Sequence, residues 1–104
     1  MTNETKLIKV NGISLEAKWV NARSHQNDRV IVFLHEGLGC VSMWRDFPQI
    51  LSNRTGLSSF VYSRQGYGKS DPVPLPRNVD FMHAEGLVVL PKILDVEGIN
   101  RAIL

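Results

Sequence analysis

The sequence lacks most features that mark specialised classes of protein. Its single cysteine, Cys40, cannot form an internal disulfide. No run of residues is apolar for long enough to span a bilayer. The opening Met-Thr-Asn-Glu-Thr-Lys is not followed by the apolar stretch of a secretory signal. These absences predict a cytoplasmic protein that makes no membrane contact.

An excess of charge of one sign is also missing. Twelve Lys and Arg residues against ten Asp and Glu give a net charge of +2, and the charges are scattered along the chain. This bias is too weak to indicate a nucleic-acid partner or an anionic membrane surface. A hydrophobic fraction of 43% in 104 residues is typical of a globular protein with one moderate core. We expect residues 1–104 to belong to a single domain, of which they are the amino-terminal part.

Three enzyme motifs are absent or incomplete. Gly-x-Ser-x-Gly does not occur in the sequence. The nearest match, residues 56–60, lacks the last glycine. A Gly-x-Gly-x-x-Gly dinucleotide fingerprint is absent too. Gly68-Lys69-Ser70 matches only the end of a phosphate-binding loop, since Ser63 stands where its first glycine is required. Pro72 and Pro74 also follow where that motif needs a helix.

Residues 6–20 predict a β-hairpin. Apolar and polar residues alternate on both sides of Asn11-Gly12, and Asn-Gly favours a type I′ turn because both residues tolerate positive φ. The alternation indicates one buried face and one wet face. The wet face of the second strand would carry Ser14, Glu16 and Lys18.

A strand–helix–strand unit follows the hairpin. Residues 30–34 and 57–62 are apolar runs typical of parallel strands covered on both faces. Residues 42–53 between them predict a helix with Ser42 as N-cap, kinked or divided by Pro48. The apolar side of this helix would carry Trp44, Phe47, Ile50 and Leu51.

The last part of the chain predicts a second helix, residues 79–97, which Pro91 must bend. Gly98 is suited to its C′ position, with Ile99 as the hydrophobic contact. Residues 102–104 predict the start of a third parallel strand. Because domains rarely end inside a central strand, we expect a truncated reading frame or a fragment. The buried face of the helix would carry Leu87, Leu90 and Leu94.

Two glycine-rich segments follow the two apolar strands. They are residues 35–40, His-Glu-Gly-Leu-Gly-Cys, and residues 63–71, Ser-Arg-Gln-Gly-Tyr-Gly-Lys-Ser-Asp. Ligands of open α/β sheets bind beyond the carboxyl ends of the strands. The glycines of the first segment let the backbone turn sharply and leave amide N–H groups free to face an anion. We expect both segments to form the rim of one pocket.

The order of these features resembles the α/β-hydrolase superfamily. The resemblance rests on a strand ending in His-x-Gly-x-Gly, a Trp shortly after it, and a strand ending in the Gly66–Ser70 turn. It covers nearly the whole chain. It implies an α/β fold, a partial hydrolase sheet with an antiparallel hairpin at one edge, then parallel strands with crossover helices. The segment from Ala102 then corresponds to the fifth strand, which leads into the Gly-x-Ser-x-Gly nucleophile elbow.

The resemblance also implies roles for the loop residues. The backbone N–H of Gly37 is the expected oxyanion-hole donor, and Leu38 is the alternative if the loop is shifted by one residue. His35 would then be structural rather than a catalytic base. The residues expected to be structural in the two loops are His35, Gly39, Gly66 and Gly68.

The chain departs from the family pattern at two places. Glu36 stands where glycine is usual, as in a His-Glu-Gly-Leu-Gly subgroup. The second strand ends in residues 63–66, Ser-Arg-Gln-Gly, where many relatives have Asp and then an Arg beside the Gly. Arg64 therefore has no role that can be carried over from the family.

Several side chains can be interpreted either as structural or as functional. Cys40 is favoured as a small loop residue over a nucleophile, because no base is identified for it. Glu36 is favoured as a loop-bracing or solvated carboxylate over a pocket acid. Trp44 and Phe47 are favoured as core residues over pocket residues. The helix residues His83 and Glu85 are expected to face solvent.

The implied function is that of a serine hydrolase acting on an ester, amide or related acyl bond. Its partner would be a small-molecule acyl substrate, and no metal or organic cofactor is implied. Because nucleophile, acid and base are absent from residues 1–104, the chain alone is expected to be inactive. One alternative is a non-catalytic, hydrolase-like binding protein, and a less favoured one is a nucleotide-binding domain that uses Lys69.

Overall fold

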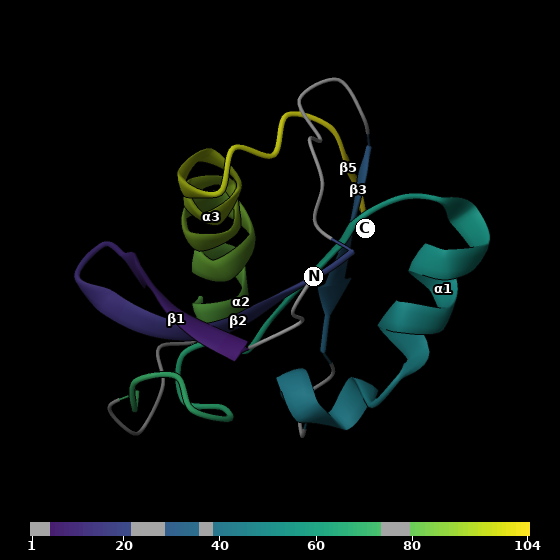
Figure 1. Ribbon diagram of the computed structural model, residues 1–104. Coiled ribbons are helices and arrows are strands. Elements are labelled where there is room, and N and C mark those ends of the chain that lie inside the picture. Colours follow the sequence, from purple (N-terminus) through teal and green to yellow (C-terminus); the bar gives the residue numbers. More distant parts are fainter. Residues whose placement is uncertain (1–4, 22–28, 36–38, 74–79) are drawn as a thin grey trace.

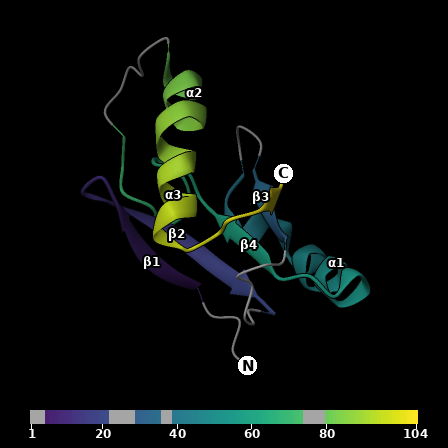
Figure 2. The same ribbon diagram turned by 90° about the horizontal axis from the view of Figure 1, so that it is seen from above.

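The computed structural model describes residues 5–21, 29–35, 39–73 and 80–104. Within them, one mixed sheet has the strand order β1-β2-β4-β3-β5. Helices cover both faces of the sheet (Figure 1), and the view from above separates α1 from the α2–α3 column on the opposite side (Figure 2). The predicted α/β architecture, a partial hydrolase sheet with a hairpin at one edge, is confirmed.

The hairpin lies where the sequence predicts it. β1 (Thr5–Val10) pairs antiparallel with β2 (Ile13–Val20), and Val10 lies opposite Ile13 across a two-residue turn. Asn11 and Gly12 have φ values of 52° and 80°, the left-handed conformation that a type I′ turn requires. β2 then pairs antiparallel with β4, which joins the hairpin to the parallel strands.

The parallel strands form the centre of the sheet. β3 (Val30–Leu34) pairs with β4 (Ser59–Tyr62) on one side and with β5 (Ala102–Ile103) on the other. Successive side chains of these strands point to opposite faces, so they contribute to two cores. The core beneath α3 contains Ile8, Val10, Leu15, Ala17, Val30, Val32, Phe60, Tyr62, Ile93 and Ile99. The core beneath α1 contains Ile31, Phe33, Val41 and Val61.

The first crossover is divided, so the prediction of one helix over residues 42–53 needs correction. A 3₁₀ turn, η1 (Val41–Trp44), precedes α1 (Phe47–Thr55). Pro48 lies in the first turn of α1, where backbone N–H groups have no intrahelical acceptor. The lack of an N–H in proline therefore costs no hydrogen bond there. Ser42 lies inside η1 and is not an N-cap. Phe47 is 49% exposed, so the expected fully buried face is also wrong there.

The second crossover is continuous but changes its winding. α2 (Phe81–Ala84), the π-helical turn η2 (Glu85–Val89) and α3 (Leu90–Val96) follow one another without a gap. The wide turn comes just before Pro91, which cannot donate an i→i−4 hydrogen bond. No helix in the described part of the chain is long and apolar enough to cross a membrane.

This change of winding alters which residues are buried. A π-helical turn takes up an extra residue, so the buried face of α3 is not in register with the face before it. Leu87 is 74% exposed and the expectation for it is wrong, whereas Ile93 is fully buried. Leu90 and Leu94 pack partly buried against the core. The C-terminal cap is confirmed: Gly98 has a φ of 71°, and the Ile99 N–H donates to the Leu94 carbonyl at 2.8 Å.

The two edges of the sheet differ in protection. β1 carries Lys6 and Lys9, and lysines on an edge strand oppose pairing with another chain. β5 covers β3 only at Val30 and Ile31, so the rest of β3 has no strand on that side among the described residues. Beside it lies an apolar groove of about 510 Å³ between β3, α1 and the end of β5.

We predict that the chain self-associates through the open part of β3. Leu34 is 42% exposed on this strand, and Leu34→Lys should weaken association because a charge opposes edge pairing. Leu7→Lys, the same change on the lysine-bearing β1 edge, serves as the control and should leave association unchanged. Sedimentation velocity over a range of concentrations measures both. A wild-type chain that stays monomeric throughout would contradict the prediction.

Candidate functional site

The two glycine-rich segments lie at one end of the sheet. β3 and β4 are parallel, and Leu34 pairs with Tyr62 at their carboxyl ends. The residues that follow each strand therefore leave the sheet at the same edge, as the sequence predicts. This is the edge where open α/β sheets bind ligands.

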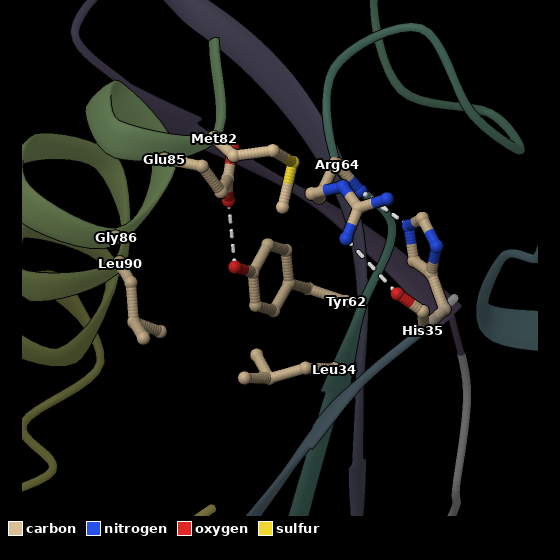
Figure 3. Close-up of a pocket in the computed structure, with 8 residues that line it drawn as sticks. All are labelled: Leu34, His35, Tyr62, Arg64, Met82, Glu85, Gly86 and Leu90. Atoms are coloured by element: carbon tan, nitrogen blue, oxygen red, sulfur yellow. Dashed lines mark hydrogen bonds between the residues drawn. The ribbon is translucent and has the colours of Figure 1, made fainter. Parts of the chain in front are cut away.

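His35 joins the two segments. Its side chain is 4% exposed, and Nε2 accepts the backbone N–H of Arg64 at 3.0 Å. The Arg64 guanidinium donates in turn, from Nη1, to the His35 carbonyl at 2.9 Å (Figure 3). This reciprocal pair is the bonding expected of a structural histidine. An imidazole nitrogen that accepts a backbone N–H is not available as a base.

Glu16 lies at the centre of the strand-end loops, although the sequence places it on a wet face. Its side chain is 5% exposed because the loop after β4 crosses over this part of β2. Oε1 accepts the Ser63 hydroxyl at 2.8 Å and the Lys69 N–H at 3.1 Å. The alternation identified the correct face of the strand but not the cover that the loop provides.

The serines of the loop extend this network. Ser63 Oγ accepts the Val41 N–H at 2.8 Å, which ties the loop after β4 to the segment after β3. Ser70 Oγ accepts the Glu16 N–H at 2.8 Å and donates to the Ser63 carbonyl at 2.7 Å. Asp71 completes the attachment to β2, because its carboxylate accepts the Ser14 N–H at 2.8 Å.

The amide groups of the loop after β4 are consequently not free. The N–H groups of Gly66, Tyr67 and Ser70 donate to backbone carbonyls, and that of Lys69 donates to Glu16. The carboxylate that this turn binds is the chain's own, that of Glu16. These four amides are therefore not available to an external phosphate, which weakens the support for a nucleotide site at Lys69.

Gly68 has a steric role in this network. Its φ is 53°, and a Cβ at this position would overlap Glu16 Oε1 and lie 2.8 Å from Ser63 Oγ. Only glycine fits against the carboxylate while adopting this backbone conformation. Gly66 also has a positive φ, 92°.

The proposed oxyanion donors Gly37 and Leu38, and Glu36 beside them, lie outside the described residues. The residues on either side are held by hydrogen bonds. His35 is bound to Arg64, and Val41 is bound to the neighbouring Ser63. Gly39 lines a cavity of about 250 Å³ together with His35, Met43 and Trp44.

Glu85 was not found by sequence reasoning, which placed it in solvent. It is 8% exposed, and its Oε2 accepts the Tyr62 hydroxyl at 2.7 Å (Figure 3). Burial, and then the Glu85 carboxylate, raise the pKa of Tyr62 above its ordinary value. No periodic signal could have identified Glu85, because its burial depends on the strand end and the Tyr62 hydroxyl that lie over it. His83 is exposed, as expected.

The remaining candidates have structural surroundings. Cys40 is partly buried and its Sγ lies 3.2 Å from the Ser42 hydroxyl. Trp44 packs edge-on against Phe33, with ring centroids 4.9 Å apart. Within the described part of the chain, no group of three or more His, Cys, Asp or Glu side chains could hold a metal ion.

Sheet order, crossover helices and two linked strand-end loops define this chain as an α/β fold of the hydrolase type. No protein-family model and no curated protein matches the sequence. An epoxide hydrolase from Vigna radiata matches in structure with a TM-score of 0.72 and 25% identity, over 98% of this chain and 30% of that one. An α/β-hydrolase fold protein from Chitinophaga pinensis matches with a TM-score of 0.68 and 25% identity, over 97% and 34%.

A laboratory-evolved variant of a potato epoxide hydrolase gives a similar result, a TM-score of 0.72 and 24% identity over 96% of this chain and 29% of that one. The chain thus has the fold of the amino-terminal part of an α/β-hydrolase. It spans about a third of the length of these structures.

The contact between Gly68 and Glu16 can be tested with two glycines of similar φ. Gly56→Ala introduces only the positive-φ penalty, about 1–2 kcal/mol, since nothing lies within 4 Å of a Cβ there. Gly68→Ala adds the overlap with Glu16 Oε1 and should cost about 1–3 kcal/mol more. Urea unfolding of both variants measures the difference. Equal losses of stability would show that the loop moves away at no cost.

Proposed function

We propose that this chain is the oxyanion-loop part of an α/β-fold hydrolase that acts on an ester, amide or related acyl bond of a small molecule. In this proposal the backbone N–H of Gly37 binds the oxyanion of the tetrahedral intermediate, with Leu38 as the alternative donor. Such a donor contributes about 3–4 kcal/mol to the transition state in enzymes of this kind. The nucleophile would follow β5, at the same edge of the sheet.

The observation that carries the proposal is the anchoring of His35 and Val41, described residues on either side of positions 36–38. Both are bound to the dipeptide Ser63-Arg64, and both bonds are buried. An oxyanion donor must be held in place before the reaction, because its value lies in needing no reorganisation. Two buried anchors a few residues apart are the arrangement that this role needs.

Epoxide hydrolysis is a second candidate reaction. It is favoured by the solved structures from Vigna radiata and potato, which are epoxide hydrolases. Both candidates place a small apolar substrate at the carboxyl ends of β3 and β4. They differ in the electrophile, so parallel assays with a nitrophenyl ester and with styrene oxide distinguish them.

Residues 1–104 alone should not turn over either substrate, since the sequence contains no nucleophile elbow. The measurement is nitrophenolate release and diol formation by the purified chain, against a heat-treated sample. Turnover that survives repeated purification and is lost in Cys40→Ser would identify a nucleophile within the chain. That result would contradict the proposal.

The genomic sequence beyond codon 104 tests the function more directly. A Gly-x-Ser-x-Gly elbow within about a dozen codons supports the serine hydrolase. A continuous reading frame of similar length without a nucleophile at that turn supports the alternative, a non-catalytic binding protein of hydrolase fold.

Gly37→Pro tests the donor itself in a polypeptide where an elbow and triad follow residues 1–104. Proline removes the N–H, so the turnover rate should fall by ~10²-fold or more in a folded protein. Glu36→Gln is the matched control, since it changes a neighbouring side chain and keeps every backbone donor, and its effect should be modest. Unchanged turnover in a folded Gly37→Pro variant would transfer the role to Leu38 or exclude this loop.

A further inference from the structure

A second cavity lies on the helix side of the strand ends, between β3, β4 and the α2–α3 column (Figure 3). Its volume is about 120 Å³, roughly four times the volume that one water occupies in the liquid. Leu34, Met82 and Leu90 supply its apolar walls, and Arg64, Tyr62 and Glu85 supply its polar groups. It is thus a small, mostly apolar space with few polar groups, as in small-molecule sites.

Arg64 is the unusual member of this lining. It is 8% exposed, yet among the described residues no carboxylate lies within ion-pair distance of its guanidinium. Nη1 donates to the His35 carbonyl and the guanidinium lies 5.1 Å from the centre of the Tyr67 ring, but the buried Nε–H has no hydrogen-bond partner in the described part of the chain. A buried charge with an unused donor is unfavourable unless an anion completes it.

The other polar groups of the cavity limit the charge of that anion. Glu85 also lines the space, and its carboxylate is already bound to the Tyr62 hydroxyl. A dianion such as phosphate would meet this negative charge as well as the cation. A single carboxylate suits the planar guanidinium, and the apolar walls suit a short hydrocarbon chain.

We propose that this cavity binds a small aliphatic monocarboxylate, whose oxygens accept hydrogen bonds from the Arg64 guanidinium. The acyl chain lies against Leu34, Met82 and Leu90. The site goes beyond the proposed hydrolase function, because it uses neither Gly37 nor a nucleophile. Either proposal can therefore fail without the other.

Butyrate is a suitable probe, with butyramide as its uncharged equivalent. The Arg64 Nε–H of the wild-type chain provides a direct ¹⁵N NMR signal, recorded at concentrations where sedimentation shows monomer. Butyrate should shift this signal saturably at millimolar concentration, and butyramide should shift it far less. No shift with butyrate, or equal shifts with both compounds, would overturn the proposal.

Three variants locate the site. Arg64→Met should weaken butyrate binding by ~10-fold or more, whereas Arg54→Met, an exposed arginine on α1, should not. Glu85→Gln should tighten binding several-fold because it removes a like charge. If Arg64→Met does not fold, the butyrate titrations of the wild-type chain and of Glu85→Gln still test whether butyrate binds in this cavity.

Discussion

The carboxylate of Glu16 is the group on which the strand-end loops depend. It accepts a hydroxyl from Ser63 and an amide from Lys69, and through Ser63 it is linked to Val41 in the segment after β3. A buried carboxylate is tolerated only when donors of this kind surround it. The requirement is mutual: the carboxylate fixes the loops, and the loops exclude water from the carboxylate. Gly68 completes the arrangement because only hydrogen fits against Oε1.

The sheet could be predicted because its signals are local. Asn11-Gly12 specifies a hairpin turn through the conformations of two residues, and continuous apolar runs specify strands covered on both faces. Side-chain burial on the helices was less predictable. One π-helical turn before Pro91 shifts the buried row, so Ile93 is buried and Leu87 is exposed. A change of one residue in winding leaves no clear trace in a hydrophobic pattern.

The candidate site was predictable in position but not in its polar contacts. Parallel strands ending together place the two glycine-rich segments at one edge, whatever their side chains do. The burial of Glu16 and Glu85 depends on what lies over them, a loop about fifty residues away for one and the ends of the strands for the other. Contacts between such distant residues have no periodicity in the sequence. The burial of a polar residue is thus difficult to predict from sequence when a distant segment of the chain covers it.

The departures from the family pattern acquire a physical explanation in these contacts. The carboxylate that lies beside Ser63 comes from Glu16 on β2. A second carboxylate at residue 63 would face Glu16 at hydrogen-bond distance, and two such charges cannot both remain ionised there at low cost. Gln65 precedes Gly66, and Arg64, one residue earlier, turns its guanidinium toward His35 and the cavity on the helix side. The Glu16 carboxylate, through Ser63, and the Arg64 guanidinium therefore keep the two loops joined. Arg64 also gives the helix side of the strand ends a buried cation.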